Sequence, residues 1–173
     1  KAWAKAPSAN RRRNILGTAK AAANAEPTAV SPNTRTVTRS RISPRTRDTS
    51  VSPATVLEAA AALDVEPARI AKTLSLRVGD QVVLVCTRGD ARLNNGKAKA
   101  ALGAKPRMLG ADEVEAITGH PVGGVCPFGL TAPLAIYCDI SLQAFDTVFP
   151  AAGSRTTSVE LTPDRLAALT GGQ

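Results

Sequence analysis

The chain has 173 residues, which is enough for one well-buried core and too few for two. Hydrophobic residues make up 43% of the chain and aromatic residues only 3%, so the core must be built from alanine and aliphatic side chains. The three cysteines lack C-x-x-C spacing and the chain has one histidine, which argues against a zinc site and favours reduced thiols in a cytoplasmic protein.

The net charge of +8 is concentrated at one end of the chain. Residues 1–50 hold 11 Lys/Arg and 2 acidic residues, a net of +9, whereas residues 51–173 hold 11 Lys/Arg and 12 acidic residues, a net of −1. The basic composition therefore does not by itself indicate that the folded part binds nucleic acid.

Residues 1–48 are predicted to form a basic, low-complexity segment, followed by a folded domain over residues 49–173. The segment is rich in Ala, Pro, Ser, Thr, Asn and Arg, so it cannot bury enough apolar area to offset the entropy lost on ordering. One interpretation is a disordered, solvated tail, and the other is a basic arm that binds RNA phosphates. The first residues also lack the apolar core of a signal peptide, so export is not expected.

The stretch over residues 116–138 carries no charged side chain and matches a membrane span in length. It contains four glycines and three prolines, however, a density that a lipid-exposed helix does not tolerate. We therefore expect an uncharged loop that leads into a strand, and no contact with a membrane.

The predicted elements begin with a helix over residues 53–63, in which Pro53 suits the first turn and apolar residues recur at helical spacing. A second short helix is predicted to follow and to carry Lys72 at a helix-to-strand junction. Strands are expected over residues 74–78 and 82–87, with hairpin chemistry between them.

Further along the chain, helices are predicted over residues 95–102 and 112–118, each followed by a glycine that can end a helix. Strands over residues 134–138, 147–149 and 158–161 precede a last helix, capped by Thr162 and ending near residue 169. The fold class is therefore α/β (mixed α+β), with a curved, partly closed mixed sheet or barrel and peripheral helices.

Lys72 lies between apolar residues, so its ammonium needs an anionic or carbonyl partner unless its stem packs and its head reaches water. The loop over residues 123–129 holds three glycines and Pro127. Its amides can form an anion-binding nest, or the loop can be an ordinary tight turn. Arg155 follows a turn and can contact phosphate or face solvent. His120 has no identifiable partner as a base, and Cys126 is more consistent with a structural thiol than with a nucleophile.

Six segments in a fixed order resemble the YbaK/EbsC family of aminoacyl-tRNA deacylases, which includes relatives of the editing domain inserted in bacterial prolyl-tRNA synthetases. They are I-A-K-T-L at 70–74, G-D-A-R at 89–92, K-x-K-A-x-L-G-A-K at 97–105, T-G-x-x-V-G-G-V-C-P-F-G at 118–129, a strand closing on Asp139, and A-G-S-R at 152–155. The resemblance covers residues 53–172 and implies a mixed α/β fold around a curved, barrel-like sheet.

The resemblance implies hydrolysis of the ester that joins a wrong amino acid (cysteine, alanine, serine or threonine) to tRNA, without a metal or cofactor. The acceptor end of aminoacyl-tRNA is then the expected partner, and an aminoacyl-tRNA synthetase is a second candidate. The alternative is a non-catalytic module of the same fold that binds a nucleotide, a tRNA end or a protein partner. Amino-acid preference and oligomeric state stay open.

Site residues carried over from the family fall into two groups. The catalytic group comprises Lys72, Gly123 and Gly124. The substrate-binding group comprises Cys126, Pro127, Phe128, Gly129, Gly153 and Ser154. In this interpretation the amides of Gly123 and Gly124 stabilise an oxyanion, Lys72 fixes the adenosine or aminoacyl group, and the nucleophile is water or a group on the substrate itself.

Overall fold

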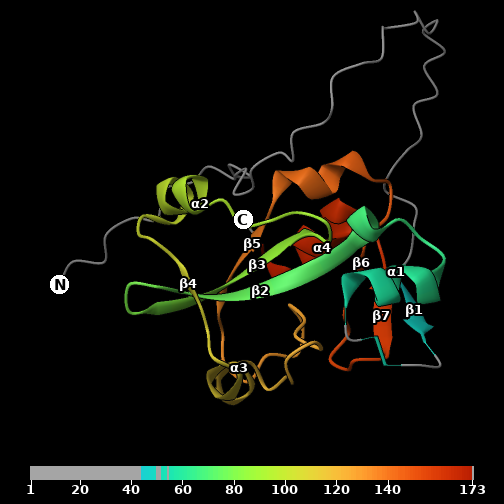
Figure 1. The fold of residues 1–173 in the computed structure, drawn as a ribbon, viewed down its shortest axis with the longest axis horizontal. Helices are drawn as coiled ribbons and strands as arrows, with labels where there is room; N and C mark the ends of the chain where they lie inside the picture. Colours follow the sequence, from blue (N-terminus) through green and yellow to red (C-terminus); the bar gives the residue numbers. More distant parts are fainter. Residues whose placement is uncertain (1–43, 50–51, 54, 173) are drawn as a thin grey trace, which may run out of the picture.

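The fold is known from a computed structural model that describes residues 44–49, 52–53 and 55–172 (Figure 1). Both interpretations of residues 1–43 concern a segment outside the described residues, so they stay predictions. In the part of the chain that is described, every α-helix is eight residues long and none could cross a bilayer.

A long hairpin, β2 (Ile70–Val78) with β3 (Gln81–Arg88), forms the centre of the sheet (Figure 1). The turn is the predicted one, with Gly79 at a φ of +59° between the paired residues Val78 and Gln81. The predicted second helix is wrong, because only Pro67–Arg69 forms a helical turn, the 3-10 helix η2, and Lys72 lies inside β2. Pairing with β3 on one edge and with a distant strand on the other stabilises the extended backbone there.

The main sheet has the order β4-β2-β3-β5, and β6 also pairs with β2. β4 (Arg107–Met108) is antiparallel to β2, whereas β5 (Ala135–Cys138) and β6 (Phe149–Pro150) run parallel to the strands they pair with. The predicted mixed α/β class is confirmed. The sheet stays open rather than closing into a barrel, because β4 and β5 are its two ends and do not pair with each other.

A second, two-stranded sheet joins β1 (Arg45–Asp48) to β7 (Thr157–Glu160). Arg47 reinforces it with an ion pair to Glu160 at 2.6 Å. The predicted boundary after residue 48 is therefore wrong by these four residues, which a strand partner more than 100 positions away holds in the domain. Isolated bridges connect the strand pair to the region of β6.

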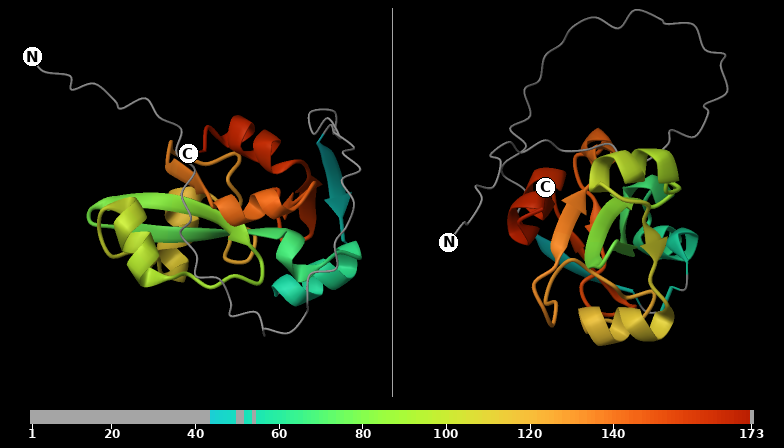
Figure 2. Two further views of the ribbon diagram at one scale, coloured as in Figure 1. Left: turned by 90° about the horizontal axis from the view of Figure 1, so that it is seen from above. Right: turned by 90° about the vertical axis from the view of Figure 1, so that its left-hand side faces the viewer.

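Helices cover both faces of the main sheet. α2 (Asn95–Leu102) packs its buried Ala98 on the face that carries Leu76 and Val85, and α4 (Pro163–Thr170) packs Leu166 on the opposite face. The end-on view in Figure 2 places α2 and α3 (Ala111–Thr118) on opposite sides of the strands. The predicted helices at these three places are confirmed to within one or two residues.

α1 (Val56–Leu63) packs beside one end of the hairpin and begins three residues later than predicted. Thr55 is its N-cap and accepts a hydrogen bond from the Glu58 N–H, while the Glu58 carboxylate accepts one from the Thr55 N–H. This reciprocal capping fixes the first residue of the helix more strongly than a proline two positions earlier does.

Aliphatic side chains and buried thiols make up the largest core cluster, as the composition predicts. Cys86 and Cys138 are neighbours in the register of β3 and β5, and all three cysteines are buried thiols that form no disulfide among the described residues. Hydrogen bonding to Cys138 and burial raise the pKa of the Cys86 thiol well above its ordinary value. These thiols therefore serve as core side chains.

Candidate active site

A cavity of about 340 Å³ opens where the outer edge of β2 lacks a strand partner. β4 pairs with β2 at Leu76 and Arg77, and β6 pairs with it at Ile70 and Ala71, so residues 72–75 lie uncovered between them. Figure 1 shows β4 and β6 near opposite ends of β2. The loop near Gly123, the turn over residues 151–158 and α1 complete the wall. The volume falls in the range of small-molecule sites.

The cavity wall is apolar for the most part and carries hydroxyl groups and two cationic residues, Lys72 and Arg155. No carboxylate, histidine or cysteine occurs among the described residues that line it. This favours an uncharged or anionic ligand, and it leaves no side-chain general base in the described part of the wall.

Lys72 lies on β2, and its ammonium bonds to the loop that follows β3. Its Nζ donates to the carbonyl oxygens of Gly89 at 2.9 Å and Ala91 at 2.5 Å. Burial lowers the pKa of Lys72, and the nearby Asp90 carboxylate partly offsets this effect. Of the alternatives left open for Lys72, the structure shows the one with carbonyl partners, and two of the three ammonium hydrogens are committed to the protein itself.

The two adjacent glycines of the predicted nest differ in what their amides do. Gly123 lines the cavity with a φ of +89°, and no described residue accepts a hydrogen bond from its N–H. The N–H of Gly124 instead donates to the Pro121 carbonyl at 2.9 Å. A Cβ at Gly124 would lie 3.2 Å from the backbone of Ser154, so this glycine permits the two loops to pack together. In this conformation Gly124 cannot be an oxyanion donor, which corrects the predicted pair.

Cys126 is buried behind the cavity wall rather than in it. Its side chain is 1% exposed, its Sγ donates to the Phe128 carbonyl at 3.2 Å and lies 3.4 Å from Nε2 of His120. That His120 nitrogen also donates to the Phe128 carbonyl, at 2.8 Å. Burial raises the pKa of the Cys126 thiol, so the structural interpretation of this cysteine is the better supported one.

The next three predicted substrate contacts face another part of the surface. Pro127, Phe128 and Gly129 line a shallow hollow together with the following residues and the end of α4, and none of them lines the main cavity. The chain turns away from the cavity after Val125, so their predicted contact with a substrate in that cavity is not supported by their position.

The last predicted turn contributes to the cavity through Ser154. Its Oγ accepts hydrogen bonds from the N–H groups of Thr156 at 3.2 Å and Thr157 at 3.1 Å, which holds the turn in shape. Gly153 has a φ of +90° and packs against the His120 ring instead of lining the cavity. Ser154 thus stabilises the turn that forms part of the cavity wall. Gly153 packs behind that wall, against the His120 ring.

Ser75 is a polar residue of the wall that was not predicted as a site residue. It is 4% exposed, it lines the cavity, and its Oγ has no hydrogen-bond partner among the described residues. Nothing in the segment L-S-L-R distinguishes this serine from an ordinary strand residue, because its isolation depends on where β4 and β6 end.

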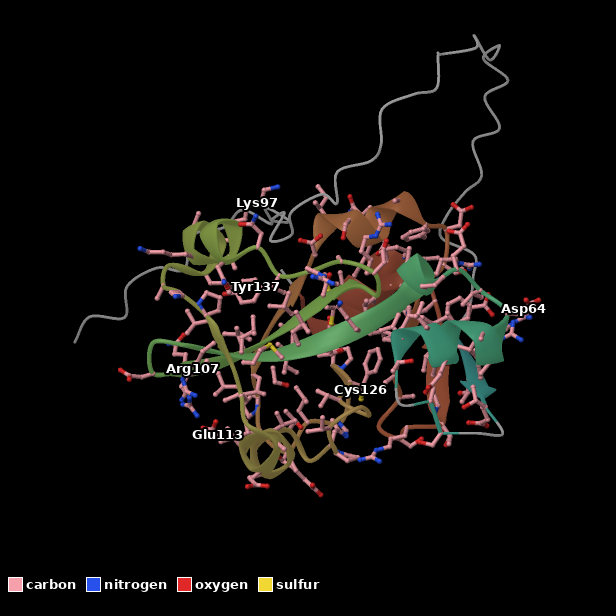
Figure 3. The ribbon with its side chains drawn as sticks, in the orientation of Figure 1. Asp64, Lys97, Arg107, Glu113, Cys126 and Tyr137 are labelled. Carbon is pink, nitrogen blue, oxygen red and sulfur yellow. The ribbon has the colours of Figure 1, made fainter. Side chains whose placement is uncertain are left out.

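Ion pairs between α3, β2 and β4 hold the cavity wall beside Ser75. Glu113 of α3 pairs with Arg77 of β2 at 2.6 Å and lies 3.9 Å from Arg107 of β4; Figure 3 shows Arg107 and Glu113 at this end of the sheet. The Gly110 N–H and the Arg77 guanidinium lower the pKa of the Glu113 carboxyl. These ion pairs connect α3 and β4 to β2 and so fix the residues that face Ser75.

A model of the aminoacyl-tRNA editing domain matches residues 52–169, which includes all of these cavity elements except the start of the wall near Thr49. The chain belongs to the aminoacyl-tRNA editing domain family. The resemblance to the YbaK/EbsC deacylases is therefore confirmed at the level of the family.

Members of the editing domain family resemble the chain over most of its folded part. YwhH of Bacillus subtilis, an uncharacterized protein, is 52% identical over 116 residues, which are 66% of this chain and 74% of that protein. EbsC of Enterococcus faecalis, a candidate Cys-tRNA(Pro)/Cys-tRNA(Cys) deacylase, is 34% identical over 117 residues, which are 66% of this chain and 71% of EbsC. A crystal structure of a candidate trans-editing enzyme for prolyl-tRNA synthetase superposes with a TM-score of 0.71 at 34% identity, covering 79% of this chain and 87% of that one.

The editing domain offers no cluster suited to a metal ion within the described ranges, where no three His, Cys, Asp or Glu side chains come together.

Proposed function

We propose that this chain is a trans-editing deacylase, which hydrolyses the ester between a wrongly attached amino acid and the terminal adenosine of tRNA. Gly123 carries the proposal: in a chain of the editing family, its N–H has no partner among the described residues and the residue lies on the wall of the cavity. The names of the relatives support tRNA(Pro) as the first tRNA to test.

Ester hydrolysis needs an oxyanion donor more than it needs a charged side chain. When the oxygen of a water molecule bonds to the ester carbon, the carbonyl oxygen becomes negative, and the Gly123 N–H would stabilise it. The carbon–oxygen bond to the ribose then breaks, the ribose oxygen takes up the proton that the water gives up, and the amino acid leaves as a free acid; a substrate group can assist by orienting this water. Because the described wall offers no side-chain base, positioning of the nucleophile supplies much of the rate.

The two cationic residues have separate roles in this proposal. Arg155 is exposed at the cavity and is suited to a phosphate of the acceptor end. Lys72 keeps the loop over residues 89–91 in place with two of its hydrogens, and the third can serve the adenosine or aminoacyl group. An aminoacyl-tRNA synthetase as a further partner stays a proposal of the same kind.

The test measures release of amino acid from tRNA(Pro) and from the cognate tRNAs charged with cysteine, alanine, serine or threonine. Gly123→Ala is expected to lower the rate at least tenfold, because alanine disfavours a φ of +89° and the amide must move. Gly79→Ala is the matched control: Gly79 also has a positive φ, has open space around it, and lies in the hairpin turn away from the cavity.

Both glycine variants should lose about 1 kcal/mol of stability from backbone strain, but only Gly123→Ala should lose activity. Equal activity of the two variants would contradict the role of Gly123. Saturable binding of tRNA without release of any of the four amino acids would favour the non-catalytic module instead.

A further inference from the structure

The hydroxyl of Ser75 is a polar group that the fold itself does not satisfy. The residue is 4% exposed, and its Oγ makes no hydrogen bond to any described residue. A buried hydroxyl without a partner costs free energy comparable to that of a lost hydrogen bond. The Oγ itself is covered, but the residue lines the cavity, so rotation of this short side chain toward the cavity would bring the hydroxyl to a ligand group that can supply the missing bond.

The backbone beside this hydroxyl also faces the cavity. The Ser75 carbonyl accepts a hydrogen bond from the Leu109 N–H at 3.1 Å, which shows that the peptide groups of Ser75 point away from β3. Since peptide groups along a strand alternate in direction, those of Thr73 point to the same open edge. Neither the N–H of Ser75 nor the N–H and carbonyl of Thr73 has a partner in the part of the chain described.

The surroundings of Ser75 select a small, neutral group. Successive side chains of a strand point to opposite faces, so Ser75 shares its face with Thr73, while the ammonium of Lys72 lies on the other face with Ile70 and Leu74. Thr73 contacts Cys86 Sγ at 3.9 Å. Two further cavity residues are apolar: Leu109, which directly follows β4 and bonds to the Ser75 carbonyl, and Val114 of α3.

We propose that Ser75 is a specificity-determining residue, whose hydroxyl bonds to the side-chain hydroxyl or thiol of the wrongly attached amino acid. The preferred substrates are then tRNAs that carry serine, threonine or cysteine rather than alanine. An alanine methyl group would occupy the same space and leave the Ser75 hydroxyl unpaired. This inference rests on the proposed function of the same cavity.

The experiment compares kcat/KM for release of serine and of alanine from the same tRNA. In the wild-type protein we expect serine to be released at least tenfold more efficiently than alanine, since one hydrogen bond distinguishes the two. Ser75→Ala is expected to reduce this ratio about tenfold. The variant should also be at least as stable as the wild type, because it removes a buried unpaired hydroxyl, and this separates loss of discrimination from loss of structure.

Ser141→Ala is the matched control. The Ser141 Oγ is also buried without a partner among the described residues, but Ser141 does not line the cavity. This variant should keep the wild-type ratio of serine to alanine.

A ratio near one in the wild type, or an unchanged ratio in Ser75→Ala, would overturn the role of Ser75 and leave the deacylase proposal intact. Release of none of the four amino acids by the wild type would overturn the proposed function itself, and the inference with it.

Discussion

Lys72 illustrates how a cation can be held in a half-buried place without a carboxylate in direct contact. The carbonyl oxygens of Gly89 and Ala91 accept its hydrogens, and Asp90 between them pairs with Arg88 at 2.6 Å instead. The ammonium therefore connects β2 to the loop that follows β3. The apolar residues around Lys72 in the sequence indicate that its ammonium needs an anionic or carbonyl partner unless it reaches water, but they do not tell which of these applies or which loop supplies the partner.

Replacing Lys72 with methionine tests this structural role. Lys72→Met should lower the free energy of unfolding by about 2 kcal/mol, because it removes hydrogen bonds from a charged donor and leaves two carbonyl oxygens without it. Urea denaturation measures the change. Lys99→Met, on the exposed surface of α2, should change it by less than about 0.5 kcal/mol. Equal stability of the two variants would show that the hydrogen bonds of the Lys72 ammonium contribute nothing to the stability of the protein.

Ser75 and Gly124 show what the sequence does not reveal about single residues. The unpaired state of Ser75 depends on two short strands ending on either side of it, and the occupied amide of Gly124 depends on a turn with Pro121. The state of the Ser75 hydroxyl and that of the Gly124 amide therefore depend on the path of the backbone, which the type of a single residue does not determine. Cys86 and Cys138, by contrast, lie in the apolar runs of two predicted strands, which is where the sequence leads one to expect buried side chains.

Helices α2, α3 and α4 were predicted to within one or two residues, because residues next to their ends determine where they begin and stop. Asn94 caps α2 through its side chain, and Gly103 ends that helix with a φ of +89°. The start of β2 was predicted wrongly, because Ile70 and Ala71 are extended by pairing with Phe149 and Pro150, almost 80 positions away. The residues next to Ile70 and Ala71 in the sequence do not indicate a strand partner so far along the chain.

The junction of α1, η2 and the β2–β3 hairpin depends on a glycine. A Cβ on Gly89 would lie 2.3 Å from the Pro67 carbonyl oxygen and 2.5 Å from Val56 Cγ1. Gly89→Ala should therefore push α1 away from Ile70 and lower the free energy of unfolding by about 3 kcal/mol. Thermal unfolding followed by circular dichroism measures the loss.

A second glycine supplies the contrast with Gly89. Gly96 lies in the first turn of α2, where an added Cβ would come no closer than 3.4 Å to another atom. Gly96→Ala should stabilise the protein by about 0.5–1 kcal/mol through helix propensity. Destabilisation of similar size in both variants would contradict the packing described at the junction.

The cavity belongs to the whole molecule, since its wall comes from α1, the edge of β2, the loop near Gly123 and the turn near Ser154. The sequence predicts that Lys72 and Gly123 converge, and both do line this cavity. It did not predict that the chain leaves the cavity at residues 126–129, because motif order does not report the direction of a loop. The hollow over residues 127–134 is therefore the alternative place at which to test binding of the acceptor end.

Backbone amide NMR of the full chain, titrated with a non-hydrolysable aminoacyl-adenosine analogue, tests the central claim most directly. The account predicts saturable shifts at Ser75, Gly123 and Thr156, and little change at Gly129 and Leu130. Shifts confined to the hollow formed by residues 127–134, with Ser75 and Gly123 unchanged, would contradict the assignment of the main cavity as the active site.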